Sequence, residues 1–117
     1  RNQVAARYTK QLYSNSGVDT PGVPEGYKSV WAQYSLLAED ENHRSRLQET
    51  LKTAGIPTAI YYPKPLHLQS AFQSLGYKEG DFPISEDCSQ RIFSVPMHPY
   101  LTEKEQTQIV ETIKLIK

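Results

Sequence analysis

The sequence predicts an α+β fold, a two-layer domain in which helices cover one face of a small, mostly antiparallel sheet. Three observations support this prediction. Segments with the periodicity of amphipathic helices alternate with short segments rich in β-branched and aromatic residues. The order along the chain is helix, strand, helix, strand, two short helices, strand and helix. The chain has 117 residues, so one domain can bury roughly two-thirds of the surface that its unfolded form exposes.

The first predicted element is a helix over residues 1–13, because Val4, Tyr8 and Leu12 recur at positions i, i+4 and i+8. No capping residue precedes this helix and no initiator methionine is present, so we expect the chain to be a piece of a longer protein. Residues 14–26 are rich in glycine, proline, serine and asparagine, a composition that is typical of a loop.

A strand is expected over residues 29–37, because the β-branched and aromatic content of this segment favours extended backbone. Large apolar groups occur on both of its faces, and this pattern indicates a central strand. Either Asp40 or Asn42 can cap the helix that follows, and Gly55 is placed to end it in the left-handed conformation.

That helix has a predicted apolar side and a predicted polar side. Its apolar stripe consists of Leu47, Leu51 and Ala54. Charges of mixed sign on a helix usually form a solvated face, so we expect water to surround a group of five side chains. These are His43, Arg44, Arg46, Glu49 and Lys52.

A second strand is predicted over residues 56–62 and ends at Pro63, because proline cannot donate to a strand ladder. A short helix is expected around residues 69–75, with Gly76 as its end. The Phe82-Pro83 pair then opens another short helix that extends to about residue 90.

The last two predicted elements are a third strand and a C-terminal helix. The strand covers residues 92–95. Thr102 and Glu105 have the spacing of a capping box, which marks the start of the helix. One apolar side of this helix consists of Ile109, Val110, Ile113 and Ile116.

Composition narrows the possible partners. Apolar residues make up 38% of the chain, charged residues 22%, and the formal net charge is +0, which does not fit a nucleic-acid-binding protein. No apolar run approaches the roughly 18 to 20 residues that cross a bilayer, so no membrane partner is expected. Cys88 is the single cysteine, and it indicates the reducing cytoplasm; no histidine lies near it in sequence to suggest a reactive thiolate.

The sequence lacks the motifs of a self-contained enzyme. It has no glycine-rich phosphate loop and no recognisable Ser-His-Asp context. His67, His98 and Cys88 do not have a familiar metal-ligand spacing. We therefore predict no catalytic, cofactor-binding or metal-binding residue within the chain itself.

Two loops stiffened by prolines, over residues 61–67 and 96–100, are better candidates for a binding site. In the first, Tyr61 and Tyr62 are expected on opposite faces of their strand, so that one joins the core and the other faces a ligand. The sequence does not decide which one. Lys64 lies between Pro63 and Pro65 and is expected at the surface. His67 either bonds to a polar ligand or caps the helix that follows it.

Three segments resemble one enzyme family in their order and spacing. They are Gly55-Ile-Pro-Thr-Ala-Ile-Tyr-Tyr-Pro-Lys-Pro-Leu-His-Leu-Gln69, Phe82-Pro-Ile-Ser-Glu-Asp-Cys-Ser-Gln-Arg-Ile-Phe-Ser-Val-Pro-Met-His-Pro-Tyr100 and Val30-Trp-Ala-Gln-Tyr34. These segments are similar to the small C-terminal domain of DegT-type sugar aminotransferases, which are fold-type I enzymes. The resemblance covers most of the chain. It implies that residues 1–16 are the end of an interdomain helix with its linker, and that residues 17–117 are the small domain.

The resemblance implies an enzyme that uses pyridoxal phosphate to transfer an amino group to a keto sugar of a nucleotide sugar. The pattern is closest to members that act on UDP-linked 3-keto sugars of bacterial surface polysaccharides. The family's Schiff-base lysine, the acidic partner of the pyridine nitrogen and the phosphate-binding backbone all belong to a large upstream domain. The cofactor is therefore expected mainly on that domain, and the chain alone should be inactive. A homodimer is also implied.

By the same resemblance, Tyr61, Tyr62 and His67 are the expected substrate-binding residues. The family's usual His-Tyr-Pro is Tyr61-Tyr62-Pro63 here, while Tyr62, Pro63 and His67 match directly. A tyrosine can donate one hydrogen bond but cannot carry the charge of an imidazolium. The competing hypothesis is a free-standing α+β module without catalytic activity, which binds a small ligand or has a regulatory role.

Overall fold

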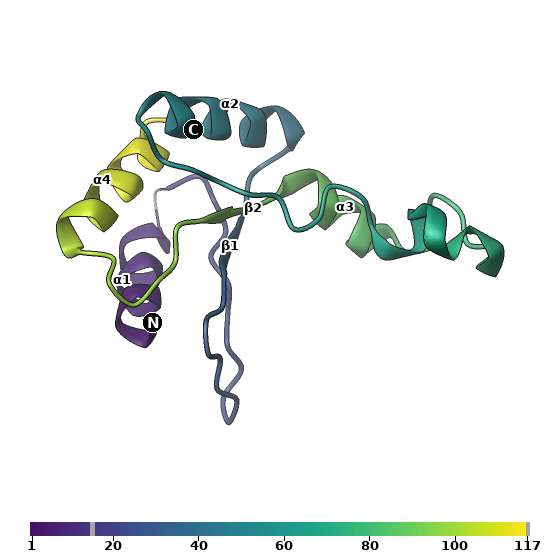
Figure 1. Cartoon of the computed structure of the whole chain (residues 1–117), viewed down its shortest axis with the longest axis horizontal. Coiled ribbons are helices and arrows are strands. Elements are labelled where there is room, and N and C mark those ends of the chain that lie inside the picture. Colours follow the sequence, from purple (N-terminus) through teal and green to yellow (C-terminus); the bar gives the residue numbers. More distant parts are fainter. Residues whose placement is uncertain (15, 117) are drawn as a thin grey trace.

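The computed structural model describes residues 1–14 and 16–116 and confirms the predicted α+β class. In chain order the elements are α1 (Asn2–Leu12), β1 (Tyr34–Leu37), α2 (Glu41–Thr53), the 3₁₀ helices η1 (Leu66–Leu68) and η2 (Ser70–Leu75), α3 (Pro83–Arg91), β2 (Ile92–Val95) and α4 (Glu103–Lys114). Figure 1 shows α1 and α4 to one side of the two strands and α2 above them. No helix among the described residues is long and apolar enough to cross a membrane.

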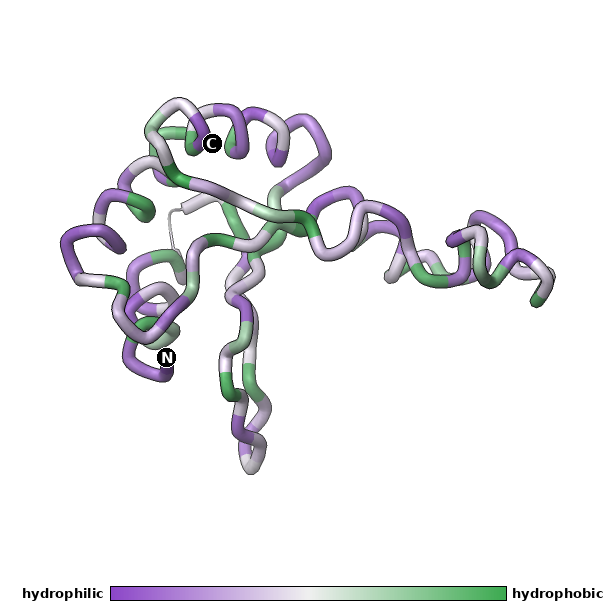
Figure 2. Tube along the Cα trace, in the orientation of Figure 1, coloured by the Kyte–Doolittle hydropathy of each residue, from purple (hydrophilic) through white to green (hydrophobic). Residues whose placement is uncertain are grey.

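Two segments project away from this packed body (Figure 1). One is the loop of residues 20–33 that leads into β1. The other, which we call the arm, consists of residues 61–82 and carries η1 and η2 beyond the end of α3. Figure 2 shows hydrophobic positions along both segments. Several of their large apolar side chains are exposed, among them Tyr27, Val30, Tyr62, Leu66 and Leu75.

The sheet is small and entirely antiparallel within the described residues. β1 pairs with β2 so that Tyr34 lies opposite Val95 and Leu37 opposite Ile92. A single bridge between Asp19 and Leu37 adds a neighbour on the outer side of β1, and another between Ala59 and Ser94 does the same for β2. β1 therefore has a partner on each edge, as expected of a central strand.

The predicted strands over residues 29–37 and 56–62 are both longer than the extended segments that the structure shows. β1 covers only residues 34–37 of the predicted 29–37, because Trp31 has a left-handed φ of 53° that interrupts extended backbone. Arg1 Nη1 donates to the Trp31 carbonyl, so this oxygen is not available to a neighbouring strand. Of the predicted strand over 56–62, only the bridge at Ala59 is present. Pro57 lies two residues earlier and has no N–H to donate, so it cannot extend the backbone ladder.

The predicted solvated face of α2 is only partly correct. Arg46, Glu49 and Lys52 are exposed as expected, but His43 and Arg44 are buried. Both imidazole nitrogens of His43 and the Nη1 of Arg44 bond to backbone groups, which offsets part of the cost of desolvation. Leu47 and Leu51 form the predicted stripe, whereas Ala54 is exposed because the helix has already ended at Thr53.

The ends of the helices follow the predicted local signals. Asp40, one of the two expected caps, accepts a hydrogen bond from the His43 N–H, and Gly55 is left-handed with φ 79°. Gly76 ends η2 with φ 81°. Pro83 opens α3. Thr102 and Glu105 form the complete capping box of α4.

The core joins α1 to both strands. Tyr8 stacks on Tyr34 with ring centroids 4.8 Å apart, and its hydroxyl donates to the Pro96 carbonyl at 2.7 Å. Burial, and secondarily Tyr34, raises the pKa of Tyr8, so this hydroxyl keeps its proton as a donor. The buried apolar residues are Val4, Ala5, Tyr8, Leu12, Val18, Tyr34, Leu36, Ala38, Leu47, Leu51, Ile56, Phe93, Val95, Leu101, Ile109, Val110 and Ile113.

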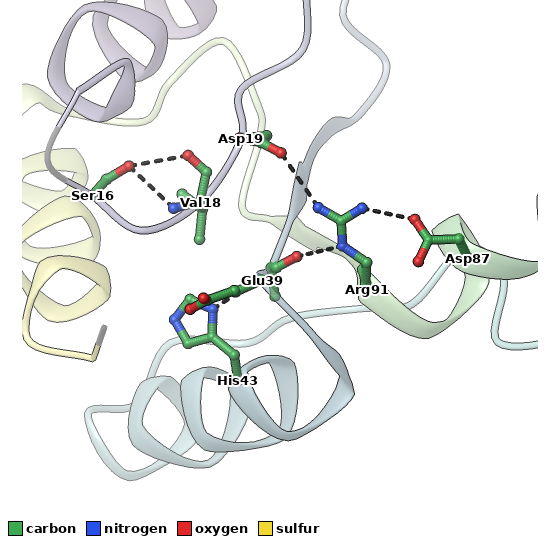
Figure 3. A network of polar contacts seen from close by, with 8 residues as sticks. Ser16, Val18, Asp19, Glu39, His43, Asp87 and Arg91 are labelled. Atoms are coloured by element: carbon green, nitrogen blue, oxygen red, sulfur yellow. Dashed lines mark hydrogen bonds and ion pairs between the residues drawn. The ribbon is translucent and has the colours of Figure 1, made fainter. Parts of the chain in front are cut away.

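Arg91 at the end of α3 ties three segments together (Figure 3). Its Nη1 donates to Asp87 at 2.7 Å and its Nη2 lies 3.4 Å from Asp19. Its Nε donates to the Ala38 carbonyl at 2.7 Å. These contacts fix α3 against the end of β1, and α3 in turn carries one wall of the site described next.

Candidate functional site

A cavity of about 650 Å³ lies between the start of the arm and α3. We call it the tyrosine cavity, since Tyr61 and Tyr62 line one side of it. Its volume falls in the range of small-ligand pockets, about 300 to 1,000 Å³. The other residues of the arm that line it are Lys64, Pro65, Leu66 and Gln69, and α3 with the start of β2 contributes Ser85, Cys88, Ser89 and Ile92.

Tyr61 and Tyr62 are both exposed, at 41% and 65%, so the prediction that one of them joins the core is wrong. The backbone ladder ends at the Ala59 bridge, and beyond that point the alternation of a strand no longer sets which face a side chain occupies. The two rings meet edge to face with centroids 5.7 Å apart. They give the cavity two flat apolar surfaces and two phenolic hydroxyls that can donate or accept.

Lys64 is exposed, as expected, and lines the same cavity. Pro63 and Pro65 flank it and fix the backbone dihedral φ on both sides. The Gln69 side-chain amide donates to the Lys64 carbonyl at 3.4 Å, a long contact that closes this loop on itself. No carboxylate among residues 1–14 and 16–116 lies within ion-pair distance of the Lys64 ammonium.

α3 presents a row of small polar side chains to the cavity. Ser85, Cys88 and Ser89 stand at positions i, i+3 and i+4, which places them on one face of the helix. Cys88 is a free thiol and is partly exposed. Sequence reasoning missed this wall of the site. The signal was the spacing of three small residues within a helix whose bounds were correctly predicted.

His67 lies behind the tyrosine cavity rather than in it. Its side chain is buried, and its Nε2 lies 3.2 Å from a carboxylate oxygen of Glu86. Its ring meets Phe82 edge to face with centroids 4.8 Å apart. The structure thus brings Tyr61 and Tyr62 together and sets His67 apart, in the wall of a second, apolar cavity of about 340 Å³.

Glu86 organises the inside of the arm. The backbone N–H of Gly80 donates to its carboxylate at 2.7 Å and that of Phe82 at 3.0 Å. The Gly80 bond has the largest effect on the pKa of the Glu86 carboxyl and lowers it. Desolvation opposes this effect, but the Phe82 bond and the His67 contact add to it, so the pKa lies below its usual value. The charged carboxylate therefore connects the base of the arm to α3.

The described residues do not fit a pyridoxal phosphate site of their own. A lysine that forms a Schiff base with this cofactor is activated by desolvation in an apolar pocket or by a neighbouring cation. None of the lysines within residues 1–14 and 16–116 is buried. The chain supplies a substrate-sized cavity with hydroxyl, amide and ammonium groups, and a covalent cofactor attachment would need residues outside it.

The known proteins that this chain resembles match nearly its whole length. The model of the DegT/DnrJ/EryC1/StrS aminotransferase family matches residues 1–114. A crystal structure of a DegT DnrJ EryC1 StrS aminotransferase from Brucella abortus superposes with a TM-score of 0.84 and 43% sequence identity, over 97% of this chain and 29% of that one.

Two curated relatives carry different names. A "Pleiotropic regulatory protein" of Geobacillus stearothermophilus is 44% identical over 115 residues, which is 97% of this chain and 30% of that protein. The UDP-2-acetamido-2-deoxy-3-oxo-D-glucuronate aminotransferase of Pseudomonas aeruginosa is 37% identical over 101 residues, 86% of this chain and 26% of that protein. The chain therefore spans less than a third of the length of these relatives.

Proposed function

Because the chain belongs to the DegT/DnrJ/EryC1/StrS aminotransferase family, we propose that it is the small C-terminal domain of an enzyme that aminates a keto sugar of a nucleotide sugar. In this proposal residues 1–16 are the end of an interdomain helix with its linker, and residues 17–117 are the small domain. α1 then docks on the domain it leads into, through Val4, Tyr8 and Leu12 in the common core.

The observation that carries the proposal is the tyrosine cavity. Tyr61 and Tyr62 stand side by side on a loop stiffened by prolines and face a space of ligand size. In the proposed enzyme their rings pack on a flat part of the nucleotide sugar, and their hydroxyls bond to its oxygens. Positioning of the sugar ketone in a cleft closed on one side by this chain raises the rate of its reaction.

His67 has a different place in the proposal. Because its imidazole is buried against Phe82 and Glu86, we assign it to the support of the arm that carries Tyr61 and Tyr62. It acts on substrate binding through the position of that arm. Neither the substrate nor a cofactor group needs to reach it.

Pyridoxal phosphate is the cofactor of this proposal and is held mainly by residues outside the chain. When bound, it carries the amino group between the donor and the sugar and delocalises the electrons of the reacting carbon. The residues described here bind and orient the sugar and exclude water from one side of the cleft.

The finer features of the proposal are a UDP-linked 3-keto sugar, a role in surface polysaccharide synthesis, a homodimer and a cytoplasmic location. The named substrate of the Pseudomonas aeruginosa relative supports the UDP linkage. The free thiol of Cys88 fits a reducing compartment.

The test uses the full-length protein that contains this chain. Addition of pyridoxal phosphate should produce a visible absorption band that borohydride abolishes, since the reductant traps a lysine-bound cofactor. With an amino donor, the protein should convert a UDP-linked 3-keto sugar to the amino sugar faster than the dTDP-linked equivalent, as measured by mass spectrometry of the product. A protein that shows no such band and forms no amino sugar would contradict the proposal.

A second candidate is a ligand-binding or regulatory module without catalysis. The name of the Geobacillus stearothermophilus relative favours it. The same assay separates the two functions. Binding of a nucleotide sugar by full-length protein that neither captures pyridoxal phosphate nor forms an amino sugar would support the regulatory function.

A further inference from the structure

The tyrosine cavity has an unbalanced positive charge on its arm side. Lys64 is exposed there and has no carboxylate within ion-pair distance among the described residues. Its backbone is restrained by the flanking prolines and by the Gln69 amide, which donates to its carbonyl. A restrained backbone lowers the entropy lost when the ammonium meets a ligand.

A second positive charge lies beneath the α3 side of the cavity. Arg44 on α2 is only 7% exposed, and its Nη1 donates to the carbonyls of Ser89 at 2.6 Å and Ile92 at 3.3 Å. Both of these residues line the tyrosine cavity. The Nε of Arg44 has no partner among the described residues, and none of their carboxylates pairs with the guanidinium. An arginine keeps its charge in such a place, since its side chain does not lose its proton in proteins.

The acidic residues of α3 are turned away from the cavity. Glu86 points into the arm, where it accepts from the backbone N–H groups of Gly80 and Phe82. Asp87 pairs with Arg91 at 2.7 Å. The described side chains that line the cavity include a lysine, two tyrosines, two serines and an amide, and no carboxylate. Hydrogen-bond donors and positive charge without a neutralising acid favour an anionic ligand.

We propose that the tyrosine cavity recognises an anionic oxygen group of the nucleotide sugar, with Lys64 as its direct partner and the buried Arg44 as a fixed charge beneath it. This inference rests on the proposed function and gives a role in specificity to Lys64, which the sequence pattern placed only at the surface. Two parts of a nucleotide sugar carry this chemistry, the diphosphate and, in a sugar acid, the carboxylate. The experiment distinguishes them.

The experiment measures dissociation constants of the full-length protein by calorimetry for UDP-glucose, UDP-glucuronate and uridine. Lys64→Met removes the charge and keeps the length of the side chain, whereas Lys64→Arg keeps the charge. Lys52→Met is the matched control, because Lys52 is an exposed lysine of α2 outside the tyrosine cavity. Arg44 is left unchanged, since it supports the start of β2.

Lys64→Met should weaken binding of an anionic ligand about tenfold, the loss expected for one charge-assisted hydrogen bond, and Lys64→Arg should restore most of it. An equal loss for UDP-glucose and UDP-glucuronate identifies the diphosphate as the group recognised. A loss confined to UDP-glucuronate identifies the carboxylate. Uridine, which has neither group, should bind Lys64→Met and the unmodified protein equally.

The inference is overturned if Lys64→Met binds both UDP-sugars as well as Lys52→Met does, or if the unmodified protein binds neither. The visible band with pyridoxal phosphate separates this failure from that of the proposed function. A protein that captures the cofactor and aminates a keto sugar, yet does not depend on Lys64 for binding, retains the proposed function and loses the anion site.

Discussion

At the scale of single residues, Glu86 makes the contacts that connect the arm to α3. Its carboxylate receives the N–H groups of Gly80 and Phe82 and lies beside the His67 imidazole. These donors favour the charged form and hold the pKa of Glu86 below the ordinary glutamate value of 4.5. The folded arm therefore gains stability from this group above pH 4.5, and it loses that stability as the pH falls through the lowered pKa.

We expect amide hydrogen-exchange protection of Gly80 and Phe82 to decrease as the pH falls from about 6 to about 3. Glu86→Gln keeps the shape of the side chain but removes the charge. It should reduce protection already at the upper end of this range and abolish most of the pH dependence. Glu79→Gln, a change at an exposed carboxyl of the same segment, serves as the control and should keep the pH dependence of the unmodified protein. Equal behaviour of the two variants would contradict the role of Glu86.

His43 connects α2 to the C-terminal end of the described chain. Its Nδ1 accepts from the Glu39 N–H at 2.9 Å (Figure 3), so the proton of the neutral ring lies on Nε2 and is donated to the Ile116 carbonyl at 2.9 Å. The side chain is fully buried. Both backbone groups lose their partner if the imidazole is removed.

His43→Ala should lower the free energy of unfolding by about 2 kcal/mol, because it leaves a cavity and two backbone groups without their partner. Urea denaturation of the protein measures this change. Lys52→Ala, at an exposed position of the same helix, should change it by less than about 0.5 kcal/mol. A His43 variant as stable as the Lys52 variant would show that these two bonds contribute nothing.

At the scale of elements, the sequence predicts those whose ends are set by local chemistry. Pro83 begins α3, Gly76 ends η2, and Thr102 with Glu105 begins α4, because each signal acts within one turn of backbone. The lengths of the strands depended on contacts that sequence patterns do not contain. Trp31 leaves the extended region where its carbonyl accepts from Arg1, thirty residues away.

The sequence likewise predicted only one side of the candidate site. The family pattern identified Tyr61 and Tyr62, and the structure places both on one cavity. It did not identify Ser85, Cys88 or Ser89, because their wall exists only where α3 packs beside the arm. The burial of Arg44 was likewise invisible, since its partners lie on α3 and β2 and are carbonyl groups that carry no sequence signal.

Gly55 gives a test of a predicted helix end. Its φ of 79° is left-handed, and a Cβ built there meets no atom within 4 Å. The cost of Gly55→Ala is therefore conformational and not steric, and we expect it to destabilise the protein by about 1 kcal/mol. Gly22 also has room for a Cβ but is not left-handed, so Gly22→Ala should be neutral or slightly stabilising. Thermal unfolding compares the two, and equal melting temperatures would contradict the account of this helix end.

At the scale of the whole molecule, a packed body carries two projections. The structure extends 48 × 36 × 23 Å, and α1, α2 and α4 enclose the core while the loop of residues 20–33 and the arm reach outward (Figures 1 and 2). The tyrosine cavity lies where the arm leaves the body. In the proposed enzyme this position lets the small domain present Tyr61 and Tyr62 to a cleft whose other wall comes from the rest of the protein.

The most direct test of this account is the Michaelis constant of the full-length protein for a UDP-linked 3-keto sugar after Tyr62→Ala. We predict a rise of about tenfold, because the variant loses a flat surface and a hydroxyl at the substrate. The visible band with pyridoxal phosphate should not change. Tyr100→Ala, at an exposed tyrosine outside the cavity, should leave both properties as they are. A Michaelis constant that is unchanged in Tyr62→Ala, or a variant that loses the cofactor band, would contradict the claim that this chain contributes the substrate side of the site.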